Sequence, residues 1–193
     1  FAYIVVGHWM QGDFSHDRKN IALTVKSFYE TFKNHKNPPA LILKTCRVNA
    51  SIGDKEVIQR KIDDIRDSVE GDNIPSVYLL HGEFTDKEMN EIYNHPKVKS
   101  MVSFTKGEGF GRPLLEFSLM NKPIIASGWS GHLDFLQSEN VGLCGGKINN
   151  VHRSAQVKGL LIEGSQWFDI DHKFINGFYN DVYDNYEGWL ERA

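Results

Sequence analysis

The feature that most constrains the fold is a regular alternation of short apolar segments with amphipathic ones. The apolar segments predict strands at residues 3–6, 40–44, 76–81, 98–104 and 123–127. The segments between them carry apolar residues at helical spacing and predict helices at residues 20–33, 54–69, 85–93 and 113–120, with a helical turn or two at 131–136. This alternation predicts the α/β class, with a parallel sheet covered by helices on both faces.

The pattern loosens after Gly145 and recovers in a terminal helix predicted over residues 172–193. Its aromatic residues are Phe174, Phe178, Tyr183 and Tyr186. We find no linker before about residue 145 and interpret residues 1–193 as one domain. The opening "FAYIVV" is typical of a core strand from its first letter, so we expect this chain to be a piece of a longer one.

Composition excludes several classes of protein. A net charge of −3 and scattered lysines provide no basic face, so we do not expect nucleic acid as a partner. No apolar run approaches the roughly 18 residues of a membrane span. Cys46 and Cys144 lie in apolar stretches, which favours two buried reduced thiols and fits a cytoplasmic protein.

The segment "GEGFGRPLLE", residues 107–116, is the strongest candidate binding site. Its three glycines let backbone N–H groups approach a ligand closely, and a helix N-terminus follows, so anionic oxygens such as phosphate suit it. Glu116 lies about one turn into that helix, where its carboxylate can accept two hydrogen bonds from a vicinal diol of a ribose or hexose. The alternative is a tight turn with a favourable glutamate in the first helical turn, which leaves Glu108 unexplained.

A second candidate is the loop "GHWMQGDFSHDRKN" after the first predicted strand. Arg18 and Lys19 stand at the start of the next helix, where a cation is disfavoured by about 0.3–1 kcal/mol. A bound diphosphate reverses that cost. The alternative is solvated surface charge.

These segments resemble retaining glycosyltransferases of the GT-B fold, the large family that includes sucrose and glycogen synthases and bacterial mannosyltransferases. The family pattern is a Glu, a Gly-Phe-Gly core and a second Glu eight positions after the first, followed by a Pro-Val-Ile-type strand and a Gly-rich turn. "GEGFGRPLLE" and "NKPIIASGWSGHLDFL" match it in order. "DRKNIALTVKSFYETF" and "LLHGEFTDKEMNEIY" resemble the family's other loops, so the resemblance covers residues 1 to about 140.

The resemblance implies a Rossmann-like three-layer α/β/α domain, the C-terminal, donor-binding half of a GT-B enzyme. It assigns the diphosphate to Lys19, with Arg18 as a helper, and the N–H of Leu114 to a phosphate. Family members usually carry Gly-Arg shortly before the lysine. This chain has Gly7-His8 or Gly12-Asp13 there, which makes Arg18 the candidate substitute.

For the rest of the donor, the resemblance assigns the ribose hydroxyls to Glu116 and the base to residues 81–84. It places the transferred sugar against Glu108 and the backbone of Gly109, Phe110 and Gly111. Lys19 and Glu108 are thus the expected catalytic residues. No metal or other cofactor is implied.

The implied function is transfer of a sugar from a nucleotide diphosphate sugar to an acceptor hydroxyl, with retention. The acceptor sugar or glycan, and any peripheral membrane association, belong to an N-terminal domain absent from this chain, so we expect the chain alone to transfer no sugar. Two alternatives stay open: an epimerase or phosphorylase on the same fold, and a non-catalytic module that binds nucleotide sugars.

Three further features carry weaker hypotheses. Asp169 and Asp171 have the spacing of metal-dependent glycosyltransferases of the other major fold, but we expect them in a loosely patterned tail, away from any strand end beside a nucleotide loop. For His132 beside Asp134 we favour packing or capping, because residues two apart on a helix diverge. Trp129 suits either a sugar cover or a fixed loop aromatic.

Overall fold

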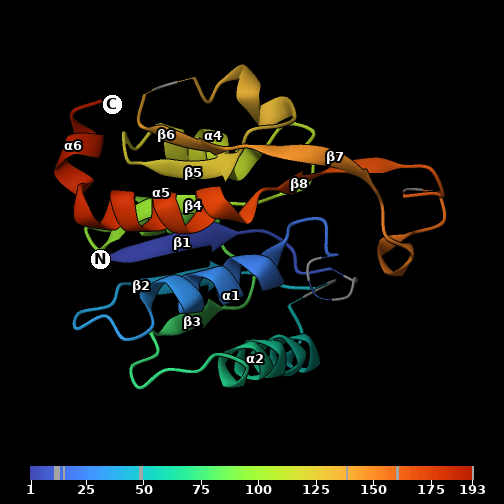
Figure 1. Ribbon diagram of the computed structural model, residues 1–193, viewed down its shortest axis with the longest axis horizontal. Coiled ribbons are helices and arrows are strands. Elements are labelled where there is room, and N and C mark those ends of the chain that lie inside the picture. The colour runs from blue at the N-terminus through green and yellow to red at the C-terminus, as the bar shows by residue number, and fades with distance from the viewer. Residues whose placement is uncertain (11–13, 15, 48–49, 138, 160, 193) are drawn as a thin grey trace.

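Six strands form one parallel sheet in the order β3-β2-β1-β4-β5-β6 (Figure 1). The computed structural model describes residues 1–10, 14, 16–47, 50–137, 139–159 and 161–192. The strands are β1 (Ala2–Val6), β2 (Ala40–Lys44), β3 (Val77–Leu80), β4 (Val98–Ser103), β5 (Ile124–Ser127) and β6 (Val141–Cys144). The first five confirm the sequence prediction, and β6 extends the sheet beyond what the apolar pattern predicts.

In the residues that the structure describes, four α-helices connect the first five strands in sequence. They are α1 (Ile21–Phe32), α2 (Ile52–Asp67), α3 (Asp86–Asn94) and α4 (Arg112–Ser118). The predicted capping box at the start of α3 is confirmed: the Glu88 N–H donates to Thr85 Oγ1 at 3.2 Å and the Thr85 N–H donates to Glu88 Oε2 at 2.8 Å. The short helical turn after β5 is a 3₁₀ helix, η1 (Gly131–Asp134).

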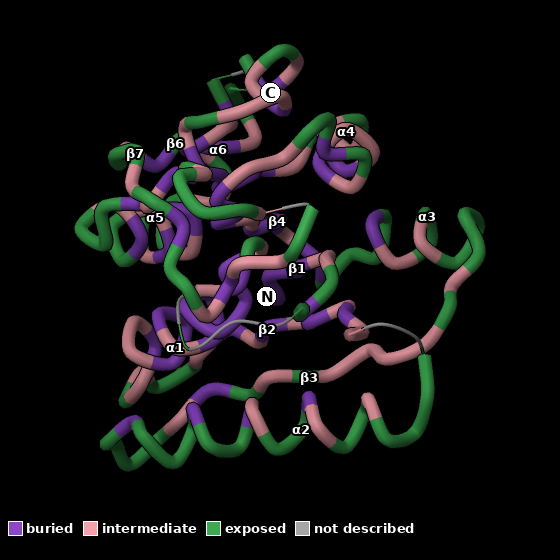
Figure 2. The backbone as a smooth tube through the Cα atoms, turned by 90° about the vertical axis from the view of Figure 1, so that its right-hand side faces the viewer, coloured by how far each residue is buried: buried purple, intermediate pink, exposed green. Residues whose placement is uncertain are grey.

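The helices lie in two layers with the sheet between them, which confirms the three-layer α/β/α architecture. Figure 2 shows α1 and α5 (His172–Asp184) on one side of the strands and α3 and α4 on the other. Strand side chains alternate between the two layers, as the period of two requires. In β1, Tyr3 and Val5 pack in the core with α1, α2 and α5, whereas Ile4 packs in the core with α3 and α4.

The terminal helix differs from its prediction near its C-terminal end. It ends at Asp184 and resumes as the short α6 (Tyr186–Leu190), because Asn185 leaves helical geometry at φ −121° and ψ 37°. Its buried face carries Ile175, Tyr179 and Val182, and the partly buried Phe174, Phe178 and Tyr183 pack against the same core. Tyr179 lies 5.1 Å from the Tyr3 ring and its carbonyl accepts from Tyr3 Oη at 2.6 Å, so α5 is fixed directly on β1.

Two antiparallel strands, β7 (Gly146–Asn150) and β8 (Gln166–Ile170), form a separate sheet that we call the arm. The arm extends past the carboxyl ends of the parallel strands (Figure 1). A short 3₁₀ helix, η2 (Arg153–Ala155), lies between the two strands in sequence. The sequence pattern predicts none of these elements.

The structure also tests the predicted burial of the two cysteines and the expected lack of a membrane span. Cys46 and Cys144 are both free, and Cys144 is buried as predicted. Cys46 is only partly buried, which corrects its prediction, because it lies at the loop surface with Sγ 3.2 Å from His8 Nδ1. In the part of the chain that the structure describes, each helix is too short or too polar to cross a membrane.

Candidate functional site

The order of the strands brings the two candidate loops together. The strand order reverses between β1 and β4. The strands β2 and β3 are added on one side of β1, and β5 and β6 are added on the other side, next to β4. The loops that leave β1 and β4 therefore flank one crevice at the carboxyl edge, where α/β sheets bind their ligands. The Lys106 N–H donates to the Arg18 carbonyl at 2.9 Å and joins these loops directly.

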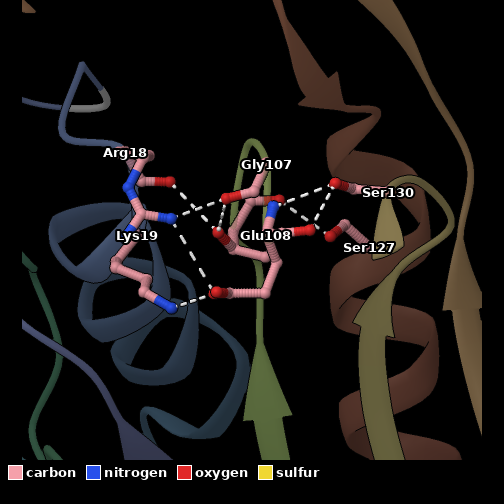
Figure 3. Close-up of polar contacts among 7 residues, drawn as sticks. Arg18, Lys19, Gly107, Glu108, Ser127 and Ser130 are labelled. Atoms are coloured by element: carbon pink, nitrogen blue, oxygen red, sulfur yellow. Dashed lines mark hydrogen bonds and ion pairs between the residues drawn. The ribbon is translucent and has the colours of Figure 1, made fainter. Parts of the chain in front are cut away.

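Lys19 and Glu108 meet in this crevice as an ion pair. Lys19 Nζ donates to Glu108 Oε2, and the two side chains are only 13% and 15% exposed (Figure 3). Burial lowers the pKa of Lys19, and the Glu108 carboxylate opposes that shift. Arg18 lies at the rim, where Nη1 donates to the Gly107 carbonyl at 2.7 Å and lies 3.8 Å from Glu108 Oε2. The sequence predicts each of these residues, but not their pairing.

Three glycines make room for this arrangement. A Cβ atom at Gly7 would lie 3.4 Å from Lys19 Cγ and Cδ, so the lysine stem runs over the end of β1 at this position. Gly111 adopts φ +89° at the start of α4, which favours glycine. A Cβ atom at Gly131 would lie 2.1 Å from the Gly109 carbonyl oxygen. Only glycine therefore fits where the start of η1 crosses residues 107–111, which we call the glycine loop.

The loop after β5 forms hydrogen bonds with the backbone of residues 105 and 108. Ser130 Oγ accepts from the Glu108 N–H at 3.0 Å and donates to the Glu108 carbonyl at 2.7 Å, as Figure 3 shows. Ser127 Oγ donates to the Thr105 carbonyl at 2.7 Å. His132 is fully buried and pairs Nε2 with the Ser127 carbonyl at 2.8 Å, and burial lowers its pKa. His132 therefore packs and braces this loop.

Two exposed aromatic residues border the crevice. Phe110 is 58% exposed and its ring lies 5.6 Å from that of Phe135. Trp129 is 45% exposed and stacks on Phe168 of the arm at 6.1 Å and 10°. The indole is thus a fixed loop aromatic that still presents a free face, and its role as a sugar cover stays a prediction.

Glu116 lies beside α3 rather than against the Lys19–Glu108 pair. It lines a cavity of about 280 Å³ with Asp86, Tyr93 and Arg112 among its other walls. Arg112 Nε donates to Glu116 Oε1 at 2.5 Å and Arg112 Nη2 donates to Asp86 Oδ1 at 2.7 Å. A ribose that binds Glu116 must therefore share or displace Arg112, a residue to which the sequence analysis assigns no role.

The other predicted donor contacts have these positions. The Leu114 N–H donates to the Gly111 carbonyl at 2.9 Å within the first turn of α4, so a phosphate must compete for it. Space opens around Gly109, where an added Cβ would meet nothing within 4 Å. In the predicted base loop, Lys44 Nζ donates to the Gly82 carbonyl at 3.0 Å and lies 5.0 Å from the centroid of the Phe84 ring. The Gly12-Asp13 pair lies outside the described residues.

The position of Asp169 corrects its prediction, which is a loosely patterned tail away from any strand end beside a nucleotide loop. It lies in β8, and its carboxylate accepts from Lys106 Nζ and, at 2.7 Å, from Asn149 Nδ2. The Lys106 side chain is 3% exposed and directly precedes Gly107. The Lys106 ammonium also lies 4.8 Å from the centroid of the Trp167 ring. This buried pair fixes the arm to the base of the glycine loop.

The metal hypothesis for Asp169 and Asp171 gains no partner residues. Asp171 instead caps α5 through a 3.1 Å bond from the Lys173 N–H. Among the residues that the structure describes, no three His, Cys, Asp or Glu side chains are placed to hold a metal ion.

Neither a protein-family model nor a curated protein matches the sequence. Solved structures do match the fold. Anabaena Alr3699/HepE, solved in complex with UDP and glucose, has a TM-score of 0.63 at 11% identity, covering 98% of this chain and 40% of its own. The C-terminal domain of a group 1 family glycosyl transferase, LpcC from Francisella tularensis, has 0.61 at 13%, covering 100% and 79%.

A third structure matches about three quarters of the chain. The α,α-trehalose-phosphate synthase (UDP-forming) from Burkholderia xenovorans, in complex with glucose-6-phosphate, has a TM-score of 0.52 at 10% identity, covering 74% of this chain and 32% of its own. This chain thus spans about 40% of HepE and a third of the synthase. In its strand order, its layers and these likenesses, the chain has the fold of the C-terminal domain of GT-B glycosyltransferases.

Proposed function

We propose that this chain is the nucleotide-sugar-binding domain of a retaining, metal-independent glycosyltransferase. The observation that carries the proposal is the Lys19–Glu108 pair in the crevice between β1 and β4, where one cation and one carboxylate stand within reach of the same ligand. A nucleotide diphosphate sugar needs both: a cation for the diphosphate and an acceptor for sugar hydroxyls. HepE, which has this fold, is solved with UDP-glucose.

In this proposal the residues act by position and charge. Lys19 and Arg18 hold the diphosphate and stabilise the negative charge that grows on it as the bond to the sugar breaks. Glu108 and the open backbone at Gly109 orient the sugar, and Glu116 orients the ribose. The acceptor hydroxyl is held by the part of the enzyme that lies outside this chain, so transfer requires both parts.

The first prediction tests binding itself. UDP is expected to bind this chain in EDTA-containing buffer, weakly, because Lys19 and Arg18 supply the positive charge that a divalent cation otherwise provides. Isothermal titration calorimetry with UDP, GDP and ADP, each with and without Mg²⁺, measures this and identifies the base. Binding that appears only with Mg²⁺ or Mn²⁺ and disappears in Asp169→Asn would replace the metal-free model by the metal model.

The second prediction concerns the ribose. Glu116→Gln is expected to weaken binding of the preferred ribonucleotide about 10- to 50-fold, because hydrogen bonds to charged groups are worth about 1.5–3 kcal/mol and glutamine keeps one acceptor oxygen. A 2′,3′-dideoxynucleotide should bind wild type poorly and be nearly indifferent to the substitution. Calorimetry provides the affinities and circular dichroism the fold.

Arg112→Gln is the matched control for Glu116→Gln. It breaks the same ion pair but keeps the Glu116 carboxylate, so ribonucleotide binding should persist. Equal losses in both variants would assign the effect to the ion pair. A Glu116→Gln protein that melts, or that binds as tightly as wild type, would make Glu116 a structural residue of α4.

A further inference from the structure

Ser130 has a backbone conformation that its residue type rarely adopts. Its φ is +91° and its ψ is −174°, a region that is essentially restricted to glycine. It is flanked by Trp129 and Gly131 rather than being a glycine itself. A serine persists in such a conformation only where the surroundings hold it there, and backbone outliers of this kind cluster at active sites.

Both hydrogen bonds of the Ser130 hydroxyl lead to Glu108. The Ser130 hydroxyl accepts from the Glu108 N–H at 3.0 Å and donates to the Glu108 carbonyl at 2.7 Å, so one hydroxyl satisfies both backbone groups of one residue (Figure 3). The Gly131 N–H adds a second donor to the Glu108 carbonyl at 3.0 Å. The backbone of Glu108 is therefore fixed from the side opposite Lys19.

The junction between the two loops has other ties that do not involve Ser130. Ser127 Oγ binds the Thr105 carbonyl, and Arg18 Nη1 binds the Gly107 carbonyl at 2.7 Å. Thr105 Oγ1 donates to that same Gly107 carbonyl at 3.0 Å. The Gly107 carbonyl and the Glu108 N–H belong to one peptide group. Arg18 and Thr105 hold that peptide at its oxygen, while Ser130 holds it at its nitrogen. Ser130 differs from these contacts in that its one hydroxyl binds both the N–H and the carbonyl of Glu108.

We propose that Ser130 is a positioning residue, whose hydroxyl sets the direction of the Glu108 carboxylate and thereby the affinity for the sugar of the donor. The proposal rests on the proposed function, in which Glu108 contacts that sugar. It separates two effects of one residue: the hydroxyl serves ligand binding, while the strained backbone lowers stability. Glycine and alanine at this position divide those effects.

The test compares Ser130→Ala with Ser130→Gly in the full chain, using UDP and UDP-glucose as probes. Both variants lose the hydroxyl, so both should lose about 5- to 10-fold of the affinity for UDP-glucose, comparable to one or two hydrogen bonds, and keep that for UDP. The glycine variant should melt at a higher temperature than the alanine variant, because glycine adopts this φ without strain. Affinities come from calorimetry and melting temperatures from differential scanning calorimetry.

Two controls complete the design. Ser68→Ala removes a hydroxyl that donates to the Ile65 carbonyl at 2.7 Å in α2, and should change neither affinity. In a Glu108→Gln background, Ser130→Ala should have little further effect on UDP-glucose, since Ser130 acts through Glu108. Additive losses in that double variant would overturn the positioning role, as would equal losses for UDP and UDP-glucose or an unchanged UDP-glucose affinity in both Ser130 variants. A wild type that binds neither probe, nor the GDP and ADP counterparts, would refute the proposed function instead.

Discussion

Asp169→Ala is expected to lower the free energy of unfolding by about 3 kcal/mol, because removal of one partner from a buried ion pair leaves the other charge unpaired. The charge left behind is Lys106, whose side chain is 3% exposed. Asn149 also loses its acceptor. The expected loss lies at the low end for buried pairs, since the Asp169 side chain itself is 31% exposed and water screens part of its charge. Urea unfolding followed by circular dichroism measures the change.

The double variant Lys106→Met with Asp169→Leu separates charge from packing. It removes both charges and retains apolar volume, so it should be clearly more stable than Asp169→Ala. Glu91→Ala, which breaks the exposed Lys87–Glu91 pair on α3, is the matched control and should change stability by less than about 0.5 kcal/mol. If Asp169→Ala unfolds at the same urea concentration as wild type, the arm is not fixed by this pair.

Much of the sheet can be predicted because local and global preferences agree there. The strands β1 and β2 are short apolar runs, and the helices that follow carry apolar residues at helical spacing. Each local choice fits one parallel sheet, and chains with such agreement are readable from sequence. The capping box at Thr85 and Glu88 extends this agreement to the start of a helix.

The arm escapes prediction because its stability is not local. Strand β7 is mostly exposed and polar, so it carries no apolar period. It pairs with β8 across the long segment between residues 150 and 166, and β8 in turn depends on Lys106, which lies 63 residues from Asp169. A contact of that separation is decided by the tertiary fold and leaves no short-range pattern.

The buried face of α5 shows the same limit at the level of one helix. Its partly buried aromatics Phe174 and Phe178 contact glycines of the neighbouring strand region: a Cβ at Gly142 would lie 2.7 Å from Phe178 Cδ1, and one at Gly145 would lie 2.9 Å from Phe174 Cε2. Large residues therefore stand over small ones at the sheet edge. Hydrophobicity alone does not tell such a rim contact from the core, where Tyr179 lies.

The residue types of the candidate site can be predicted from the sequence, but the contacts among them cannot. The glycine loop indicates Glu108 and the loop after β1 indicates Lys19, since each stands where a parallel sheet binds ligands. That the two neutralise each other follows only from the distance between them in the fold. The sequence analysis misses Ser130 and Arg112 because serine is common in loops and arginine is common in helices, and only their contacts in the fold single them out.

Lys19→Gln is expected to weaken binding of UDP and of UDP-glucose about 10- to 100-fold, because a charge-assisted hydrogen bond to phosphate is worth about 1.5–3 kcal/mol. The Lys19 side chain is largely buried, so water does not readily replace the hydrogen bond that its ammonium donates to phosphate. Lys26→Gln is the matched control: it lies on α1 with Nζ 5.4 Å from the centroid of the Phe14 ring, and should change neither affinity.

Glu108→Gln is expected to change the affinities for UDP and for UDP-glucose by different amounts. Glu108 Oε2 accepts from the Lys19 ammonium, and its charge also repels an incoming diphosphate. Removal of its charge frees Lys19, so UDP should bind about 3- to 10-fold more tightly, a modest part of what a nearby charge is worth at a partly buried site. UDP-glucose should gain less or lose, because the carboxylate that accepts from the sugar is gone. Parallel titrations of wild type, Lys19→Gln and Glu108→Gln measure these changes. If Glu108→Gln weakened UDP as much as Lys19→Gln does, the carboxylate would be needed to hold the lysine in place, and the pair would be a structural unit that the diphosphate does not open.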